Sequence, residues 1–381
     1  MADLKGAIYK IEDISKIFGH RYVLNNVNFD IKIGEIFGIL GTSGSGKTTL
    51  LNSLVGFLKV ERGDIKFRDV NVLNQDDEKA FRSIYWHQKE LKKTYGFAPQ
   101  TPSFYPNLTI KENLCYFGSL YNLPKKLIES NLSYLLNLVG LTQSQYVVAK
   151  RLSGGMQRRL DIACSLIHDP KILLLDEPTA DLDPLTSSKI WNLLKIINQR
   201  GTTIIIASHH IANLEQLCNR VLILKEGHIV ALGKPEEIKM KNIPEENICF
   251  KSYPGKYEQI IKALKNKFLK EIKDYEIKNK TLIIHTTKPP LVIHELLKVT
   301  EELNEGIIEL ELIKPTLDKA FIMIQENSIN KEIKIAKEQH KKKKLKKHRH
   351  HHKKHFKKKN KKDKKKDEVK KEENEAVKNN Q

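Results

Sequence analysis

The sequence predicts an α/β protein with two folded domains and a basic C-terminal tail. Three observations support this prediction. Short apolar runs typical of buried strands alternate with segments of helical periodicity up to about residue 240. A shorter alternation of strands and helices follows at 248–326. From residue 331 onward the chain is a low-complexity stretch rich in Lys and His.

A glycine-rich loop separates a predicted strand at 36–40 from a predicted helix that begins near residue 50. In such a loop glycines let successive backbone N–H groups point at phosphate oxygens, and the helix turns its positive end toward the same anion. Lys47 would reach the β- and γ-phosphates, and Thr48 would hold Mg²⁺. The predicted strand before the loop and the predicted helix after it favour a P-loop nucleoside triphosphatase over a chance Gly-rich turn. The loop consists of Gly41, Thr42, Ser43, Gly44, Ser45, Gly46, Lys47, Thr48 and Thr49.

The positive charge of the chain is concentrated in its tail. Residues 331–381 carry 23 Lys and Arg against 8 Asp and Glu, a net charge of +15, which leaves +6 of the total of +21 for the preceding residues. No apolar run approaches the ~20 residues of a membrane span, and the N-terminus lacks the apolar core of a secretion signal. The cysteines form no metal pattern and are expected to be reduced, buried thiols of a cytosolic protein, namely Cys115, Cys164, Cys218 and Cys249.

Two adjacent acids follow the apolar run at 172–175. Such a run is typical of a central parallel strand, and the carboxyl ends of parallel strands line the ligand crevice of open α/β sheets. Asp176 would then face Mg²⁺, and Glu177 would orient or deprotonate the attacking water. The alternative, two acids that cap the next segment, would leave carboxylates at the end of a buried strand.

A second strand-sized run, at 203–207, ends just before His209 and His210. A histidine at the carboxyl end of a strand could sense or polarise a γ-phosphate. Taken alone, such a histidine is more often an ordinary loop residue.

Phe18 lies between two alternating segments, 7–12 and 27–33, which suit an antiparallel hairpin or small sheet. Its ring could stack on a purine base, an interaction worth about 1–3 kcal/mol. The spacing alone favours a core residue beside a turn. A further short strand, 95–100, ends at Gln100, where neighbouring prolines mark a loop.

Ser153, Gly154 and Gly155 begin a predicted helix that runs through Leu166. Ser153 is a natural N-cap, and the bare N–H groups at the positive end of the helix form a second candidate anion site. Without other evidence this would be a plain helix start.

Two segments have predicted surface roles. Residues 108–139 show helical periodicity with an apolar stripe that is either core or a partner groove. Residues 74–95 are polar and charged, and they suggest a surface excursion, partly helical, that either contacts a partner or is an unconstrained loop.

Taken in their order along the chain, the motifs of residues 1–240 resemble those of the nucleotide-binding subunit of ABC transporters. Gly41–Thr49 resemble the Walker A motif and Ile172–Glu177 resemble Walker B. Leu152–Gln157 resemble the signature motif, although Met156 stands where Gln is commonest. The remaining matches are Phe18 to the adenine-stacking aromatic, Gln100 to the Q-loop glutamine, Ala180–Asp183 to the D-loop and His209 to the switch histidine.

The resemblance implies an ATPase in which two identical or related subunits sandwich two ATP molecules. Catalytic roles fall to Lys47, Glu177 and His209. ATP would contact Phe18, the loop 41–49, Gln100, Ser153, Gly154, Gly155 and Asp183, and Mg²⁺ would contact Thr48, Gln100 and Asp176. The pore would belong to a separate transmembrane permease that docks near Gln100 and on a helical subdomain at about 101–170. The chain is therefore expected in the cytoplasm, peripheral on the cytoplasmic face of the membrane.

The C-terminal parts predict two different kinds of structure. Residues 248–326 read as a β-α-β-β-α-β domain of ferredoxin-like type, and their end resembles an accessory domain on ATPases of drug-, lipid- and polysaccharide-exporting ABC systems. This domain is either regulatory, dimer-supporting or a packing appendage. Residues 331–381 are expected to be disordered or a lone charged helix. They could bind anionic lipid, nucleic acid or, through histidines, a transition metal, or remain a solvated tail.

Export powered through a separate membrane protein is therefore the first functional prediction. The alternative is a soluble ABC-type ATPase that acts on nucleic acid or ribosomes, which the basic tail favours slightly. The translation-type relatives, however, carry two cassettes in one chain, and only one is present here. A binding module with an inactive site is opposed by the presence of Lys47, Asp176, Glu177 and His209.

Overall fold

The computed structural model describes residues 6–69, 80–268 and 270–326. The chain forms two compact units, Met1–Ile322 and Met323–Gln381. Within the second unit only residues 323–326 are described, and they are helical. The predicted tail at 331–381, with its lipid, nucleic-acid and metal contacts, lies outside the described residues.

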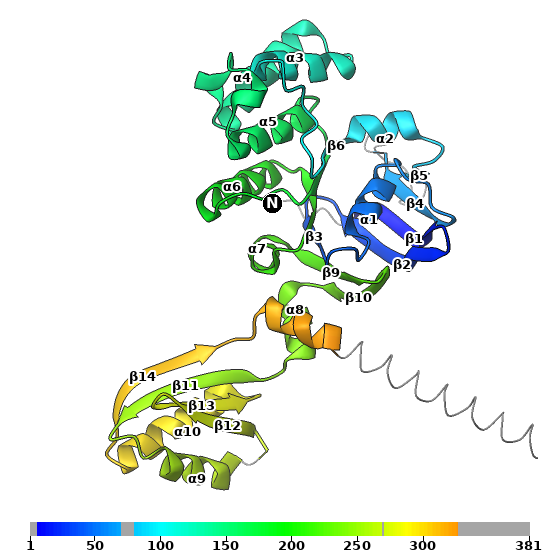
Figure 1. Ribbon diagram of the computed structural model, residues 1–381. Helices are drawn as coiled ribbons and strands as arrows, with labels where there is room; N and C mark the ends of the chain where they lie inside the picture. Colours follow the sequence, from blue (N-terminus) through cyan, green and yellow to red (C-terminus); the bar gives the residue numbers. More distant parts are fainter. Residues whose placement is uncertain (1–5, 70–79, 269, 327–381) are drawn as a thin grey trace, which may run out of the picture. The chain divides into compact units, whose positions relative to one another are not determined.

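A six-stranded sheet of mostly parallel strands carries the motifs (Figure 1). Its order is β10-β9-β3-β8-β7-β6, and only the β9–β10 pair is antiparallel. Every residue of β3, β7 and β8 is buried, as their apolar sequences predict. The strands are β3 (Ile36–Leu40), β6 (Tyr95–Ala98), β7 (Ile172–Asp176), β8 (Thr203–Ser208), β9 (Arg220–Lys225) and β10 (His228–Gly233).

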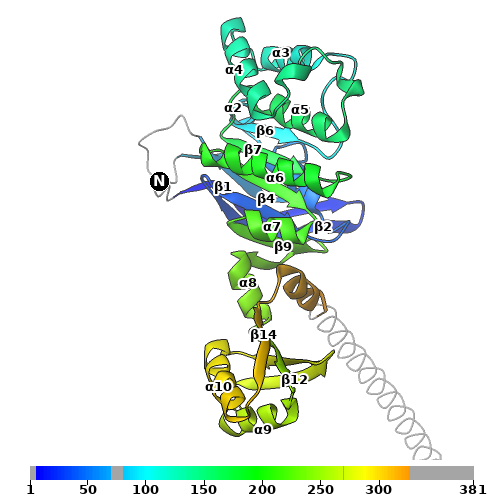
Figure 2. The same cartoon turned by 90° about the vertical axis from the view of Figure 1, so that its left-hand side faces the viewer.

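A helix follows each of the strands β3, β7 and β8. α1 (Lys47–Leu54) follows β3, α6 (Pro184–Gln199) follows β7, and α7 (Ile211–Leu217) follows β8. Figure 2 shows α6 and α7 in front of the sheet. Leu50, Leu51 and Leu54 of α1 join the main hydrophobic core, which extends from β3 and β7 to the second sheet. The strand–loop–helix setting that the sequence predicts for the glycine-rich loop is confirmed.

The second sheet is antiparallel and has the order β2-β1-β4-β5. Its strands are β1 (Ala7–Phe18), β2 (Arg21–Lys32), β4 (Arg62–Arg68) and β5 (Phe81–Ser83). The hairpin prediction is confirmed, but β1 and β2 extend further than 7–12 and 27–33. The extension was not evident because register shifts between Ile11 and Ile17 break the period-two alternation on which strand prediction depends.

Residues 80–95 are not the surface excursion that their polarity suggests. Strand β5 pairs with β4, and α2 (Gln88–Thr94) follows it. Ile84 and Leu91 lie in the main core. The apolar residues of this stretch stand singly among charged ones, so their periodicity is too weak a signal to predict that they are buried. The prediction that this part is partly helical is confirmed by α2, the prediction of a surface excursion is wrong for it because Ile84 and Leu91 are buried, and residues 74–79 lie outside the described residues.

A helical layer lies between β6 and β7 in the sequence. It contains α3 (Ile110–Leu120), α4 (Lys125–Leu138), the 3₁₀ turns at Thr142–Ser144 and Ala149–Arg151, and α5 (Gly154–Leu166). Thr109 and Glu112 form a reciprocal capping box at the start of α3. The predicted apolar stripe of α4 is buried at Ile128, Leu132, Leu135, Leu136 and Val139, whereas Leu127 is exposed.

Helix α5 lies directly against β6. A Cβ atom at Gly96 of β6 would lie 2.0 Å from the carbonyl oxygen of Ser165 near the end of α5. Only glycine permits this approach of strand and helix backbones.

The C-terminal part of the first unit has its own sheet and core. After α8 (Pro235–Asn242), the elements are β11 (Glu246–Tyr253), α9 (Tyr257–Phe268), β12 (Ile272–Lys278), β13 (Thr281–Thr286), α10 (Pro289–Glu302) and β14 (Gly306–Ile313). The sheet is antiparallel with the order β12-β13-β11-β14. Apolar residues of α9 and α10 form one hydrophobic cluster with those of β11 and β13.

Across the described residues, no helix is both long and apolar enough to cross a membrane. All four cysteines are free thiols. Cys164 and Cys218 are buried, as expected, but Cys115 and Cys249 are only partly buried.

Candidate functional site

The glycine-rich loop is shaped by its own backbone. Gly44 and Gly46 have φ angles of 75° and 107°, a region that favours glycine. Gly46 is the N-cap of α1 and offers no side chain to cap it, so the first N–H groups of the helix remain available to an anion. A Cβ at Gly41 would lie 2.4 Å from Oγ of Ser45 and 2.5 Å from the carbonyl oxygen of Leu224.

Lys47 lies inside this loop. Its Nζ donates hydrogen bonds to the carbonyl oxygens of Gly41 at 2.8 Å and Thr42 at 3.1 Å. Burial lowers the pKa of Lys47, and the nearby carboxylates of Glu177 and Asp176 oppose this effect. The lysine is therefore a buried cation at the base of the loop, where a phosphate would compete for the same three N–H donors.

Asp176 ends β7 beside the loop. Its carboxylate accepts a hydrogen bond from the Thr48 hydroxyl, and burial raises its pKa. Among the described residues, Oδ1 of Asp176 has no hydrogen-bond partner although it is buried. An unpaired carboxylate oxygen next to a hydroxyl is the kind of oxygen pair that Mg²⁺ prefers.

Glu177 has the most constrained backbone at the site. Its φ angle is 45°, and its N–H donates to the carbonyl oxygen of Ala207 at 2.8 Å. The side chain is nearly buried, and its Oε1 lies 2.9 Å from Nδ1 of His209. Its Oε2 accepts from the Ser208 hydroxyl at 3.1 Å and from the His209 N–H at 3.4 Å. Two hydrogen bonds and the close contact with Nδ1 of His209 thus fix this carboxylate at the carboxyl ends of β7 and β8.

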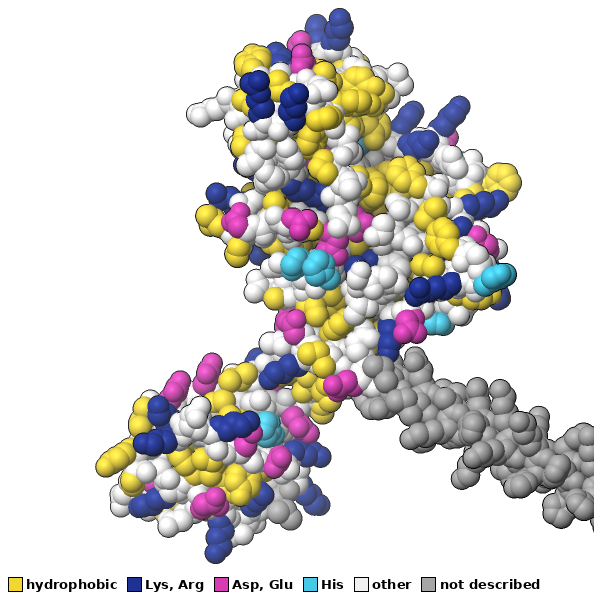
Figure 3. Space-filling view, in the orientation of Figure 1, with side chains coloured by type: hydrophobic (Ala, Val, Ile, Leu, Met, Phe, Trp, Pro, Cys, Tyr) yellow, Lys and Arg dark blue, Asp and Glu magenta, His cyan; other side chains and the backbone are white. Residues whose placement is uncertain are grey.

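These groups surround a cavity of about 450 Å³. Figure 3 shows histidine side chains at the surface near acidic side chains on the face that this view presents. Gly41, Thr42, Ser45 and Asp176 are not among the lining residues. The residues that line it are Val23, Ser43, Gly44, Gly46, Lys47, Thr48, Thr49, Gln100, Glu177 and His209.

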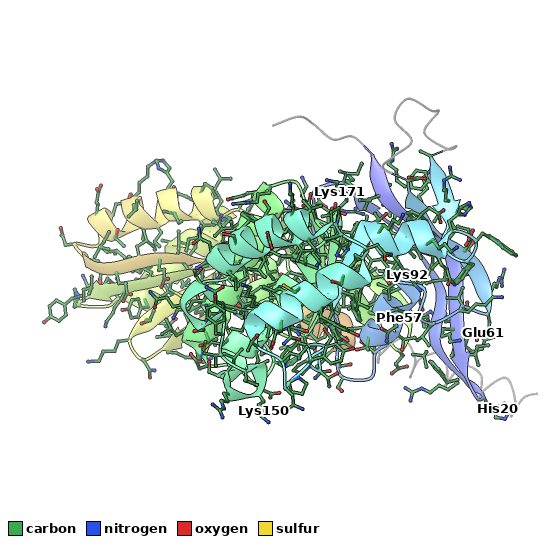
Figure 4. All side chains as sticks on the ribbon, turned by 90° about the horizontal axis from the view of Figure 1, so that it is seen from above. His20, Phe57, Glu61, Lys92, Lys150 and Lys171 are labelled. Atoms are coloured by element: carbon green, nitrogen blue, oxygen red, sulfur yellow. The ribbon has the colours of Figure 1, made fainter. Side chains whose placement is uncertain are left out.

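Phe18 lies outside the lining of this cavity. It ends β1 at the tip of the β1–β2 hairpin, next to the turn at His20, which is labelled in Figure 4. Its side chain is 49% exposed, so the interpretation as a core residue is wrong. The adenine-stacking role stays a prediction.

Ser153, Gly154, Gly155 and Asp183 are also absent from the cavity lining. The Ser153 hydroxyl caps α5 by accepting from the Met156 N–H. Asp183 caps α6 by accepting from the Thr186 N–H at 2.9 Å, and this bond lowers its pKa. Ser153 begins α5, as expected, Asp183 caps the start of α6, and the contact of all four residues with a nucleotide stays a prediction.

Sequence reasoning missed two contributors. Val23 lines the cavity from β2, and no local pattern marks it. Ser208 orients Glu177, and its position just after the apolar run of β8 was the available signal.

The combined geometry defines a class of protein. A phosphate loop at the start of α1 and a carboxylate–histidine pair line one cavity, and the buried Asp176 carboxylate at the end of β7 accepts a hydrogen bond from Thr48 of that lining. This is the arrangement of a P-loop ATPase.

Known proteins extend this classification. The ABC transporter family matches residues 24–180. Nod factor export ATP-binding protein I of Bradyrhizobium diazoefficiens is 30% identical over 84% of this chain and 96% of its own length. The linearmycin resistance ATP-binding protein LnrL of Bacillus subtilis is 28% identical over 82% and 96%. Among solved structures, cbiO1 from Clostridium perfringens, part of the ABC transporter complex cbiONQ, is 28% identical over 70% of this chain and 97% of its own, with a TM-score of 0.55.

A second solved structure is a dimer of the ATP-binding cassette MJ0796 in a post-hydrolysis state with ADP and Pi. It is 30% identical, covers 59% of this chain and 98% of its own, and has a TM-score of 0.51. The chain therefore belongs to the ABC transporter family and is one of its ATP-binding ATPases, which confirms the resemblance drawn from the motifs.

Proposed function

We propose that this ATPase powers export through a separate transmembrane subunit. The observation that carries the proposal is the cavity in which Lys47, Gln100 and the Glu177–His209 pair converge. The relatives named for Nod factor export and linearmycin resistance support the direction, and their alignments cover almost their whole length. The membership of cbiO1 in a transporter complex supports a separate permease. Such a partner would hold the chain on the cytoplasmic face of the membrane.

ATP would lie between two copies of this chain or between this chain and a related subunit. Ser153 and Gly154 are exposed and do not line the loop cavity of their own subunit. Neither the loop cavity nor the start of α5 alone surrounds a triphosphate. The start of α5 would therefore contact the nucleotide that is bound to a second subunit. The dimeric MJ0796 structure supports this arrangement. Phe18 and Asp183 would complete the nucleotide contacts.

Thr48, Asp176 and Gln100 would hold Mg²⁺. The buried, unpaired Oδ1 of Asp176 and the adjacent Thr48 hydroxyl fit a hard cation. When bound, the ion would supply charge neutralisation between the β- and γ-phosphate oxygens.

Residues of the chain itself would bind the phosphates, activate the water and orient the base. Lys47 would exchange its loop carbonyls for phosphate oxygens. Glu177 would orient the attacking water and accept its proton. His209 would hold Glu177 in place and reach the γ-phosphate with its exposed edge. Residues 1–240 would thus form the ATPase domain, and 248–326 a ferredoxin-like accessory domain with a regulatory or dimer-supporting role.

The test uses Glu177→Gln, which keeps the shape of the side chain but removes the base. Turnover should fall at least about 10²-fold, ATP binding should persist, and the ATP-bound dimer should accumulate. A matched control is Glu305→Gln, since Glu305 is also nearly buried and accepts hydrogen bonds from Ser252, Gly255 and Lys256 in the C-terminal sheet region. This control should lower stability but not turnover.

The ATP-locked Glu177→Gln protein then serves as bait in its native cells. A multi-span membrane protein that co-purifies in near-equal amount would support the proposed export function. Ribosomal subunits or RNA without a membrane protein would overturn it and favour the soluble alternative. Near-native hydrolysis by the variant would remove Glu177 from its proposed role.

A further inference from the structure

A single arginine of α5 binds three backbone carbonyls in two segments of the chain. Arg158 is 9% exposed, and its Nη2 donates to the carbonyl oxygen of Asp176 at 2.9 Å. Its Nε donates to the carbonyl oxygen of Pro178 at 3.1 Å, and Nη1 donates to that of Pro99 at 2.5 Å. These carbonyls belong to the end of β7, the turn after it and the segment after β6.

Asp161, one turn further along α5, completes this cluster. Its Oδ2 lies 3.1 Å from Nη1 of Arg158, and the residue is wholly buried. Its Oδ1 accepts hydrogen bonds from both the N–H and the hydroxyl of Ser103. Burial lowers the pKa of Arg158 and raises that of Asp161, and their mutual attraction opposes both effects. The buried ion pair of Arg158 and Asp161 therefore depends on the surrounding hydrogen bonds, which compensate both charges for the loss of water.

The bound carbonyls flank two residues of the candidate site. Pro99 immediately precedes Gln100, while Asp176 and Pro178 stand on either side of Glu177. Glu177 itself has the left-handed φ angle that non-glycine residues avoid. A guanidinium can hold such divergent acceptors at once because its five N–H groups form a rigid planar fork, which an ammonium group lacks.

We propose that Arg158, supported by Asp161, is a positioning residue that fixes the backbone at Gln100 and Glu177 relative to α5. Any displacement of α5 is then transmitted to both segments, because the same guanidinium holds them. The inference deepens the proposed function, since it rests on Gln100 and Glu177 acting on ATP. Its direct structural test needs no nucleotide.

Arg159 provides a matched control on the same helix. Its guanidinium also donates to backbone carbonyls, those of Val139, Gly140 and Gly155, and to none of the segments that Arg158 binds. Arg158→Lys and Arg159→Lys therefore make the same chemical change at adjacent positions. Asp161→Asn is the second test variant, to be used if Arg158→Lys does not fold.

The experiment compares backbone hydrogen exchange by mass spectrometry in the nucleotide-free, full-length proteins. Arg158→Lys should speed exchange at 100–103 and 177–180 about tenfold or more, because hydrogen bonds to a charged donor are lost there. Arg159→Lys should leave these segments unchanged. ATPase assays should then show a lower kcat with little change in KM for Arg158→Lys only.

Two results would overturn the inference: exchange in Arg158→Lys equal to that of the wild type at both segments, or the same acceleration in Arg159→Lys. The exchange data also separate this inference from the proposed function. A wild-type protein that engages no membrane partner would end the export proposal, whereas the segment-specific exchange would still establish the positioning role.

Discussion

Nδ1 of His209 lies 2.9 Å from Oε1 of Glu177, although the two residues immediately follow different strands of the sheet. The imidazole is 56% exposed, while the carboxylate is nearly buried. The histidine therefore reaches from the solvent-facing cavity to the acid that it holds. Because His209 faces the cavity and contacts Glu177, a ligand that moves the imidazole would also change the orientation of the Glu177 carboxylate, the proposed base.

Replacing His209 by Gln should lower turnover about 10²-fold, because Glu177 loses the group that orients it. ATP binding should change little. His210→Gln is the control, since the two rings are adjacent but only His209 pairs with Glu177. Steady-state ATPase kinetics measure both variants, and equal losses in the two would contradict the specific role of His209.

Replacing Phe18 by Ala should weaken ATP binding about tenfold or more, if the ring stacks on adenine at 1–3 kcal/mol. Tyr22→Ala supplies the comparison, because Tyr22 is a similarly exposed aromatic on the same hairpin, at 52% against 49%. Calorimetric titration with ATP gives both affinities. An unchanged affinity in Phe18→Ala would assign the ring no part in nucleotide binding.

Alanine at Gly46 should destabilise the folded protein more than alanine at Gly44. Both positions have positive φ, which costs an alanine about 1–2 kcal/mol. A Cβ at Gly46 would also lie 2.7 Å from the carbonyl oxygen of Val23, whereas one at Gly44 meets nothing within 4 Å. Urea unfolding without nucleotide measures the difference, and equal midpoints would show that the loop relaxes around residue 46.

Acid should destabilise the fold through His168. This ring stacks on Tyr121 at 3.6 Å, its Nε2 lies 3.0 Å from the carbonyl oxygen of Tyr95, and burial lowers its pKa to about 4. The unfolded chain binds a proton near pH 6.5 that the folded state accepts only near pH 4. The contribution is therefore complete above pH 6.5 and falls by up to about 3 kcal/mol as the pH drops to 4.

Urea unfolding at pH 7.5 and pH 4.5 tests this effect against His168→Gln. The variant should lose less stability than the wild type over this interval. Identical losses would show that other groups cause the acid sensitivity.

Much of the candidate site was predictable because its residues follow buried strands and glycine-rich turns. Lys47, Glu177 and His209 line one cavity although they are far apart in the sequence, since parallel strands bring their carboxyl ends together. The order of strands and helices in 248–326 also follows the predicted β-α-β-β-α-β pattern.

The missed features depend on contacts that no local pattern encodes. Val23 reaches the cavity because β2 passes the loop. Arg158 looked like an ordinary helix residue, and only the fold shows that it faces three carbonyls. Ile84 and Leu91 were hidden among charged neighbours, and their burial follows from packing of β5 and α2.

The close contact at Gly96 limits how the helical layer can move. With strand β6 and the Ser165 carbonyl in backbone contact, the end of α5 has no room to slide across the sheet. A displacement that preserves this contact is a rotation about it, which carries Ser153, at the opposite end of α5, through the widest arc. Gly96 would thus be the pivot of such a rotation, and the N-terminal end of α5, at Ser153, would move furthest.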